Sequence, residues 1–169
     1  LSVAKLAPAL IAGNAVVFKP ATQGAISAVK IIESFDKVGF PDDVLQLITG
    51  KGSDIGDYVS EHEGIDMISF TGGATTGRHL SSFSTMKPMV LELGGKDPAI
   101  VCEDADIDKA VTEIMSGAFS YSGQRCTAIK RVLVNEAIAD EVATKLKAEV
   151  EKLTVGMPID NPVIVPLIN

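Results

Sequence analysis

The chain has 169 residues, of which 46% are hydrophobic and 22% are charged, and its formal net charge is −7 at pH 7. This length suffices for one sizeable core or for parts of two smaller domains. The excess of acidic side chains disfavours nucleic-acid binding, which needs a basic surface. No run of about 18 apolar residues is present, so the sequence predicts neither a membrane-spanning helix nor a membrane partner.

The two cysteines, Cys102 and Cys126, are too few for a disulfide framework, and the first residues lack the features of a signal peptide. We therefore expect a reducing, cytoplasmic compartment. Because the sequence begins without Met and stops at Asn169 without a helix cap or tail, we expect it to be an internal segment of a longer protein.

Short apolar runs alternate with helical patterns along the first part of the chain. The run 15–18 predicts a strand that stops at Lys19 and Pro20, and apolar residues at three- and four-residue steps then predict a helix that ends near Gly39 and Pro41. Further strands are expected at 44–48, 67–70 and 89–93, with a turn at 50–53 leading into a short helix. Because these runs are continuously apolar, the sequence predicts a parallel α/β sheet covered on both faces.

A domain boundary is expected near Gly94 and Gly95. Beyond it, the sequence predicts a strand at 98–102, a helix capped by Asp106, a loop at 120–127, a strand at 131–134 and a helix from about 137 to 153. The predicted fold class is therefore α/β, with a parallel-sheet, Rossmann-like part at 1–94 followed by the start of a second α/β domain at 95–169.

The loop 120–127 contains the thiol of Cys126. Free cysteine is usually a buried, inert residue, which is the alternative interpretation. Loops of small polar residues often present reactive groups, and Arg125 and Lys130 bring positive potential that favours a thiolate. Cys126 is therefore a candidate nucleophile, whereas Cys102, expected inside an apolar strand, is predicted to be inert.

Glu92 ends an apolar strand and is followed closely by Gly94 and Gly95. In open parallel sheets, ligands bind outside the carboxyl ends of the strands. The alternative is a charged residue that marks the exit of the strand into solvent. Paired glycines let backbone or ligand approach closely, and a carboxylate can activate water. A nucleophilic thiol together with such a base suits covalent catalysis through a thioester.

The glycines Gly72, Gly73 and Gly77 follow a strand ending at Thr71 and open a predicted helix. Backbone N–H groups and the helix dipole favour a pyrophosphate at such a turn. The segment is neither the Gly-x-Gly-x-x-Gly fingerprint nor a Walker sequence, and many glycine-rich turns are only turns. It is therefore a weak indication of a dinucleotide site.

Single titratable residues elsewhere carry weaker signals. Lys19, just past the first strand, can reach ribose hydroxyls or a phosphate, and a solvated strand-end lysine is the alternative. His62 and His79, the two histidines, share no ligand spacing with the cysteines, so no metal site is expected. No Gly-x-Ser-x-Gly sequence is present, which argues against a serine hydrolase.

Four motifs resemble the aldehyde dehydrogenase superfamily in order and approximate spacing: Lys19-Pro20-Ala21, Phe70-Thr71-Gly72-Gly73 with Gly77, Glu92-Leu93-Gly94-Gly95-Lys96, and Gly123-Gln124-Arg125-Cys126. The resemblance covers essentially the whole chain. It implies an NAD(P)-dependent oxidation of an aldehyde to an acid by a homo-oligomer, either a dimer or a tetramer. It also implies that 1–94 is an incomplete cofactor-binding part and 95–169 an incomplete catalytic part.

The resemblance also assigns roles to individual residues. Cys126 would attack the aldehyde to give a thiohemiacetal, and Glu92 would activate the water that hydrolyses the thioester left by hydride transfer. The backbone N–H of Cys126 would form half of an oxyanion hole. The implied cofactor-binding residues are Lys19 and Thr22 at the adenosine ribose, Gly52 and Gly56 at the adenine, and Gly72, Gly73 and Gly77 at the pyrophosphate, together with Thr71 and Leu93.

A finer resemblance, carried by residues 19–24 and 119–128, is to the NADP-dependent, non-phosphorylating glyceraldehyde-3-phosphate dehydrogenases. Thr22 stands where NAD-preferring members carry a Glu, and its neutral hydroxyl does not repel a 2′-phosphate. The resemblance thus implies NADP as cofactor, with NAD as the alternative. Arg125, beside the nucleophile, would pair with a substrate phosphate.

Three alternatives stay open: an aldehyde dehydrogenase for a different aldehyde, an NADPH-dependent acyl-phosphate reductase, and an inactive fragment that keeps the site as a relic. The Asn that completes the family's oxyanion hole and the Glu that holds the nicotinamide ribose would lie outside this segment. We therefore expect the 169 residues alone to be inactive or nearly so.

Overall fold

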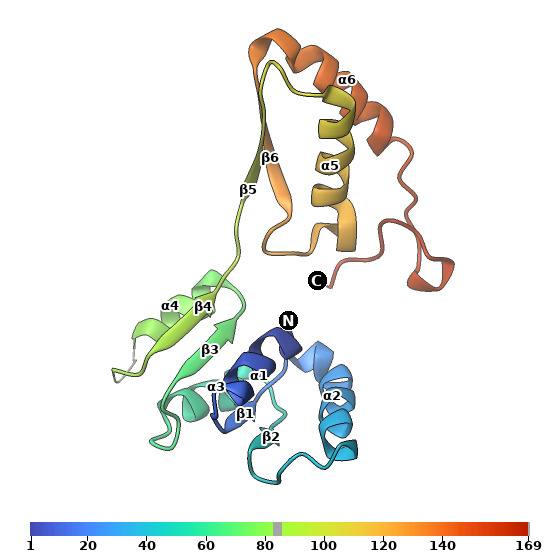
Figure 1. The fold of residues 1–169 in the computed structure, drawn as a ribbon. Coiled ribbons are helices and arrows are strands. Elements are labelled where there is room, and N and C mark those ends of the chain that lie inside the picture. Colours follow the sequence, from blue (N-terminus) through green and yellow to red (C-terminus); the bar gives the residue numbers. More distant parts are fainter. Residues whose placement is uncertain (83–85, 169) are drawn as a thin grey trace. The chain divides into compact units, whose positions relative to one another are not determined.

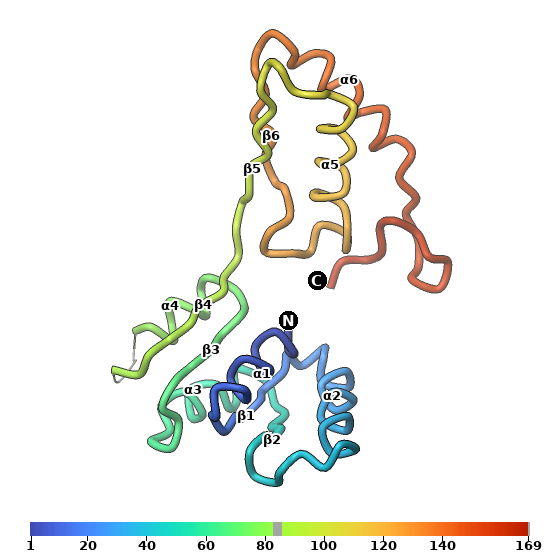
Figure 2. Tube along the Cα trace, viewed as in Figure 1, coloured from blue at the N-terminus to red at the C-terminus, as the bar shows by residue number. Residues whose placement is uncertain are grey.

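The computed structural model describes residues 1–82 and 86–168, and Figures 1 and 2 follow the chain from its N-terminus to its C-terminus. By its internal contacts the chain divides into two units. The first comprises Leu1–Thr71 and Thr75–Glu92, and the second comprises Gly72–Ala74 and the chain from Leu93 onward. This division lies close to the predicted boundary at 94. The assignment of the two parts as cofactor-binding and catalytic stays a prediction.

Helices and strands alternate from residue 1 to residue 92 (Figure 1). The helices are α1 (Ser2–Ile11), α2 (Ala25–Lys37), α3 (Gly52–Glu61) and α4 (Ala74–Ser82), and the strands are β1 (Val16–Phe18), β2 (Leu45–Leu47), β3 (Ile68–Thr71) and β4 (Met89–Glu92). β1 pairs with β2 and β3 pairs with β4, both in parallel. Parallel pairing confirms the predicted α/β class and places the carboxyl ends of each pair at one edge.

The C-terminus of α2 shows how local sequence sets an element boundary. Gly39 adopts φ +68°, and its N–H donates to the carbonyl of Asp36 at 3.0 Å. The N–H of Phe40 donates to the carbonyl of Phe35 at 3.2 Å, and the two rings meet edge to face at 5.1 Å. A glycine in the left-handed region followed by an apolar contact is a common way for a helix to end. The predicted stop is confirmed.

Helix α1 was not predicted from the sequence. Pro8 lies inside this helix, where it removes a backbone donor and normally argues against helical structure. The helix is held by tertiary contacts instead, because Leu6 is buried and the Nζ of Lys5 donates to the Oγ of Ser69 in β3 at 2.9 Å.

The second unit repeats the strand–helix alternation. It contains β5 (Asp97–Val101), α5 (Ile107–Phe119), β6 (Ile129–Val134) and α6 (Ala139–Val150), with β5 parallel to β6. The carboxylate of Asp106 accepts a hydrogen bond from the N–H of Lys109 at 3.1 Å, which confirms the predicted cap of α5. Val101, Ile114 and Val142 form the centre of the core.

The prediction that both sheet faces are covered is wrong for the described residues. Burial alternates along the strands of the first unit, where Val17 of β1 and Val90 of β4 are 45% and 42% exposed. In the second unit, Ile100 and Leu133 are 71% and 52% exposed. Both α5 and α6 contribute to the single core on the other face of β5 and β6. A continuously apolar sequence thus indicates that both faces of a strand can be buried, but it does not show that the described residues cover both faces. No helix among residues 1–82 and 86–168 has the length and apolarity to cross a membrane.

Candidate active site

The candidate nucleophile lies in the segment that joins α5 to β6, within the second unit. The chain leaves α5 at Phe119, forms the 3-10 turn Ser120–Gly123 and presents Cys126, which is exposed, before β6 begins. A Cβ placed on Gly117 would lie 2.5 Å from the Cδ1 of Ile129. The absence of a side chain at Gly117 thus lets the end of α5 approach the start of β6. We call residues 120–127 the nucleophile loop.

The nucleophile loop contains an unusual backbone turn. Tyr121, Ser122 and Gly123 have φ values of 54°, 56° and 69°, so three consecutive residues adopt the left-handed region. For the two residues with side chains this costs roughly 1–2 kcal/mol each. Glycine is required at the third position, because a Cβ on Gly123 would lie 2.9 Å from the carbonyl oxygen of Ala118. Such strain persists at functional sites only where neighbouring contacts hold it.

Residues near the end of the chain supply some of those contacts. The Oγ of Ser122 donates to the carbonyl of Val165 at 3.3 Å and accepts from the N–H of Val165 at 2.9 Å. The Oε1 of Gln124 accepts from the N–H of Ile168 at 2.9 Å. Two side chains of the loop therefore bond to one later stretch of backbone, which fixes the loop on that side.

Arg125 is partly held by the protein itself. Its Nη2 donates to the carbonyl of Gly117 at 3.2 Å, and its guanidinium lies 5.6 Å from the centre of the Tyr121 ring. Its Nε is buried and has no hydrogen-bond partner. Arg125 therefore supports the loop and retains one unsatisfied donor, and its predicted role in binding a substrate phosphate stays a prediction.

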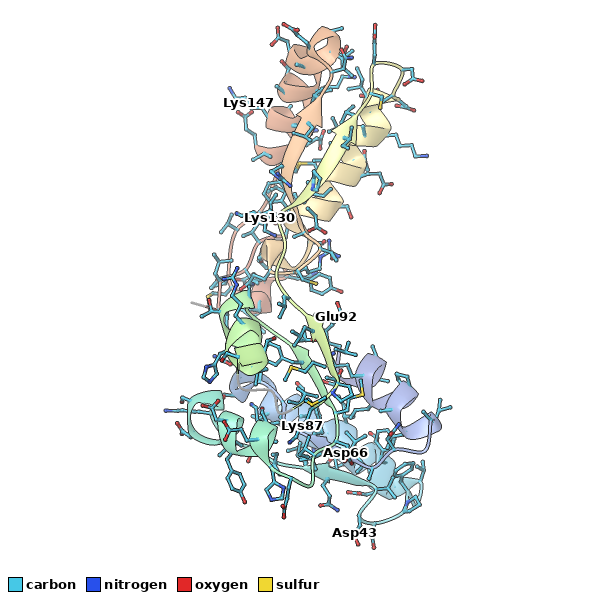
Figure 3. All side chains as sticks on the ribbon, turned by 90° about the vertical axis from the view of Figure 1, so that its left-hand side faces the viewer. Asp43, Asp66, Lys87, Glu92, Lys130 and Lys147 are labelled. Carbon is cyan, nitrogen blue, oxygen red and sulfur yellow. The ribbon has the colours of Figure 1, made fainter. Side chains whose placement is uncertain are left out.

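Lys130 makes contacts that the sequence analysis missed. From the sequence, Lys130 was expected only to bring positive potential to the loop. Its Nζ donates to the carbonyls of Gly123, Ala128 and Arg125 at 3.1, 3.4 and 3.5 Å, respectively. Figure 3 labels this residue near the start of β6. In the sequence, only the position of Lys130 three residues after the loop pointed to these hydrogen bonds.

Glu92, the candidate base, is the last residue of β4 and is exposed. It is labelled in Figure 3, and it stands opposite Thr71 in the β3–β4 register. Glu92 belongs to the first unit and Cys126 to the second, so their convergence on one substrate stays a prediction. Leu93, predicted to contact the cofactor, is half-buried and belongs to the second unit.

We call residues 92–96 the glycine segment. Within it, Gly95 lies next to the backbone of the nucleophile Cys126. A Cβ on Gly95 would lie 3.1 Å from the carbonyl oxygen of Cys126 and 2.5 Å from the Oδ1 of Asp97. A Cβ on Gly94 would meet nothing within 4 Å. The backbone at Gly95 therefore passes directly against the backbone of Cys126, whereas Gly94 is open.

The turn after β3 has the features of a phosphate site. The Oγ1 of Thr71 is buried and has no hydrogen-bond partner, and Gly73 has open space around it. Gly72 is half-buried and Gly77 is buried within α4, whose first turn carries no acidic residue. An unpaired hydroxyl beside a helix N-terminus without a carboxylate fits the phosphates of a dinucleotide.

The predicted adenosine-binding residues lie on segments that follow β1 and β2, whose carboxyl ends share one edge. Lys19 is half-buried, and its Nζ donates to the carbonyl of Pro20 at 3.1 Å. Thr22 is exposed at the start of a 3-10 turn. Gly52 and Gly56 lie in α3 with no atom near a Cβ at either position. A side chain at either glycine would therefore meet no other part of the described chain.

The predicted environment of Cys102 is wrong. β5 ends at Val101, and Cys102 opens a turn in which the N–H of Ala105 donates to its carbonyl at 3.1 Å. Its side chain is exposed, as is that of Cys126, so exposure does not separate the two thiols. In the described part of the chain, no group of three or more His, Cys, Asp or Glu side chains is arranged to hold a metal ion.

Known proteins resemble the whole chain. The model of the aldehyde dehydrogenase family matches residues 1–169. The NADP-dependent glyceraldehyde-3-phosphate dehydrogenases of Streptococcus equinus and Pisum sativum are 54% and 52% identical to the whole chain, which covers 36% and 34% of their lengths. The chain therefore spans about a third of the length of these curated relatives.

Two solved structures illustrate the structural similarity. The NADP-dependent glyceraldehyde-3-phosphate dehydrogenase from Bacillus halodurans C-125, complexed with NADP, is 57% identical with a TM-score of 0.94, over 98% of this chain and 35% of that one. The betaine aldehyde dehydrogenase from Staphylococcus aureus, in complex with NAD+, is 35% identical with a TM-score of 0.90, over 98% of this chain and 33% of that one.

Proposed function

The chain belongs to the aldehyde dehydrogenase family, and we propose that it supplies the nucleophile and the water-activating base of a longer enzyme that oxidises an aldehyde to a carboxylic acid. The observation that carries this proposal is the exposed Cys126 at the end of a strained, multiply bonded loop whose neighbour is the glycine segment. Strain of this kind is characteristic of functional sites.

In the first step the thiolate of Cys126 attacks the aldehyde carbon. A carbon–sulfur bond forms, and the carbonyl π electrons move to oxygen to give a thiohemiacetal oxyanion. We propose that the backbone N–H of Cys126 donates to this oxyanion. A fixed loop favours that role, because donors placed before reaction need no reorganisation when the charge appears.

Bound NADP would supply the acceptor for the hydride that leaves the thiohemiacetal carbon. The acyl group then remains on Cys126 as a thioester. The unpaired Thr71 hydroxyl, the glycine turn and the open space at Gly52 and Gly56 support binding of a dinucleotide by this chain. Lys19 and Thr22, on the segment that follows β1, are the proposed contacts to the adenosine ribose and its 2′-phosphate.

In the last step Glu92 accepts a proton from water, and the resulting hydroxide attacks the thioester carbonyl. The carbon–sulfur bond breaks, the acid leaves, and the thiolate of Cys126 is restored. Glu92 is suited to this role because it is exposed at the carboxyl end of a parallel strand, where ligands bind in such sheets.

We propose glyceraldehyde 3-phosphate as the substrate and NADP as the preferred cofactor. The two curated relatives quoted above carry both in their names. The buried, unsatisfied Nε of Arg125 beside Cys126 supports an anionic substrate, since a charged donor of this kind pairs well with phosphate. We also propose a reducing, cytoplasmic location, which keeps the thiol free, and a homo-oligomeric parent.

The test is turnover of the full-length protein in buffer without inorganic phosphate. Glyceraldehyde 3-phosphate and NADP should give NADPH and a free acid, more efficiently than with NAD or with an unphosphorylated aldehyde. Cys126→Ser should abolish the reaction, whereas Cys102→Ser should not. Full activity of Cys126→Ser would exclude the proposed nucleophile.

Replacing Glu92 separates hydride transfer from hydrolysis. Glu92→Gln should still release about one equivalent of NADPH in a burst, because thioester formation needs no base at that position. Steady-state acid release should fall by about 10²–10⁴-fold, the usual contribution of a general base. Glu103→Gln removes another exposed carboxylate, in the turn after β5, and serves as the control.

The same variant distinguishes the alternative reaction. An acyl-phosphate reductase forms the thioester without a hydrolytic base, so its turnover with acyl phosphate and NADPH would be insensitive to Glu92→Gln. Equal loss of burst and steady-state phases in Glu92→Gln would contradict the assignment of Glu92 as the hydrolytic base.

A further inference from the structure

The pairing of β5 with β6 is irregular next to the nucleophile loop. Asp97 pairs with Ile129, but the next residue, Pro98, pairs with Arg131, so Lys130 has no partner in the ladder. Proline has no backbone N–H to donate to the ladder, and within sheets it is confined to edge strands, strand starts and bulges. Pro98 therefore accounts for the irregular pairing.

The bulge changes which way the side chains of β6 face. Along a regular strand, neighbouring side chains alternate between faces. Here Lys130 and Arg131 are both exposed, and regular alternation resumes at Val132. Two adjacent cationic side chains thereby become available to the segments that precede β5 and β6.

Each of the two cations bonds to a different segment. The Nζ of Lys130 donates to carbonyls on both sides of Cys126 in the chain, at Gly123, Arg125 and Ala128. An ammonium has three donors, so these bonds account for all of them. The Nε and Nη2 of Arg131 donate to the carbonyl of Lys96 at 3.0 and 2.8 Å.

These bonds bear on the geometry of Cys126. Lys130 holds the carbonyl of Gly123, at the end of the left-handed turn, and also one carbonyl directly before Cys126. Arg131 holds the glycine segment one residue beyond Gly95, whose Cα faces the carbonyl of Cys126. The bulge thus fixes the loop and the glycine segment against each other.

We propose that Lys130 and Arg131 are positioning residues, which act through backbone carbonyls to hold the nucleophile loop and the glycine segment in register. Lys130 does so by its three hydrogen bonds and not by its charge on the thiol. The inference rests on the proposed function in one respect, the assignment of Cys126 as the nucleophile.

The test compares Lys130→Met with Lys130→Arg in the full-length protein carrying Cys102→Ser. Lys147→Met is the matched control, since it also removes one exposed ammonium of the second unit but holds no loop carbonyl (Figure 3). The measurements are the rate of Cys126 alkylation by iodoacetamide from neutral to alkaline pH, kcat, and KM for NADP.

For Lys130→Met we expect alkylation and kcat to fall by about 10- to 100-fold, the cost of a misplaced reacting group, with KM for NADP unchanged. The pH profile of alkylation should keep its shape, because the loop and not the charge is affected. Lys130→Arg, which keeps donors on a long stem, should recover most of the rate, and Lys147→Met should match the parent. Arg131→Met should show a similar loss, which Arg131→Lys, with a single point donor in place of a fork, should only partly recover.

Two results would overturn the inference. One is alkylation and turnover of Lys130→Met within about twofold of the parent, a change below 0.5 kcal/mol. The other is a pH profile displaced to alkaline pH with an unchanged plateau, which would assign Lys130 a purely electrostatic role. If Lys130→Met does not fold, Lys130→Gln replaces it in the same comparison.

Amide hydrogen exchange separates this inference from the proposed function. Faster exchange across the nucleophile loop in Lys130→Met supports positioning even if Cys126→Ser proves active. Unchanged exchange in the loop contradicts positioning, whatever the outcome for Cys126.

Discussion

Gly95→Ala is the sharpest test of the contact between the glycine segment and the nucleophile. The new methyl group would lie 3.1 Å from the carbonyl oxygen of Cys126 and 2.5 Å from the Oδ1 of Asp97, and the first of these atoms belongs to backbone. The Asp97 carboxylate can rotate away, whereas the carbonyl can move only with the loop. We therefore expect the displacement to fall on Cys126.

Overpacking of a well-packed core costs about 1–3 kcal/mol, which is an upper bound for this exposed site. If all of this strain displaced the nucleophile, its reactivity would fall by roughly 5- to 150-fold. The assay is iodoacetamide labelling of Cys126 in a Cys102→Ser background without cofactor, together with the midpoint of thermal unfolding. Labelling should slow within that range, and the midpoint should decrease.

Gly94→Ala is the matched control, because a Cβ at that position meets nothing within 4 Å. It should leave labelling unchanged and should not lower the midpoint, since Gly→Ala reduces the entropy of the unfolded chain. Adding Asp97→Ala to Gly95→Ala should restore neither stability nor reactivity, because the strain lies at the carbonyl of Cys126. Equal labelling rates for Gly95→Ala and Gly94→Ala would refute the reasoning.

Two further predictions concern the same unit. Gly123→Ala forces a side chain into φ +69° and places its Cβ within 2.9 Å of the carbonyl oxygen of Ala118. The variant should slow alkylation of Cys126 and lower the unfolding midpoint by an amount equivalent to about 1–2 kcal/mol. Unchanged values would contradict the left-handed turn. Hydrogen bonds to Asp108 and then to Glu141 raise the pKa of Lys145 above its ordinary value of 10.5. That stabilisation is complete below the unfolded-state pKa and is lost as pH rises through the folded-state pKa. The difference in unfolding midpoint between the parent and Lys145→Met should therefore shrink above about pH 10.5, and a constant difference would exclude this cause.

Local signals in the sequence predicted much of the secondary structure. Asp106 as a helix cap and Gly39 as a helix stop depend only on residues within a few positions, and both are observed. The helix α1 was missed because Pro8 is locally unfavourable, and tertiary contacts of Leu6 and Lys5 outweigh that cost. Local propensity cannot express such a balance.

Prediction from the sequence was more limited for the candidate site. The motifs picked out Cys126 and Glu92 by residue type and spacing, but they gave no indication of the backbone around them. Tyr121 and Ser122 do not favour the left-handed region, so their conformation depends on bonds that the motifs do not reveal, such as those of Lys130 and Val165 to the loop. Cys102 was placed in a strand because apolar runs do not mark where pairing ends.

The hydroxyl of Ser122 finds its partner in Val165, a residue 43 positions later. At about 5–20 residues per second, translation reaches that partner roughly 2–9 s after the loop has been made. A nascent chain on the ribosome therefore carries the cysteine for several seconds before the backbone that presents it can be completed. The loop that presents the thiol therefore cannot form all of its contacts until Val165 has been synthesised.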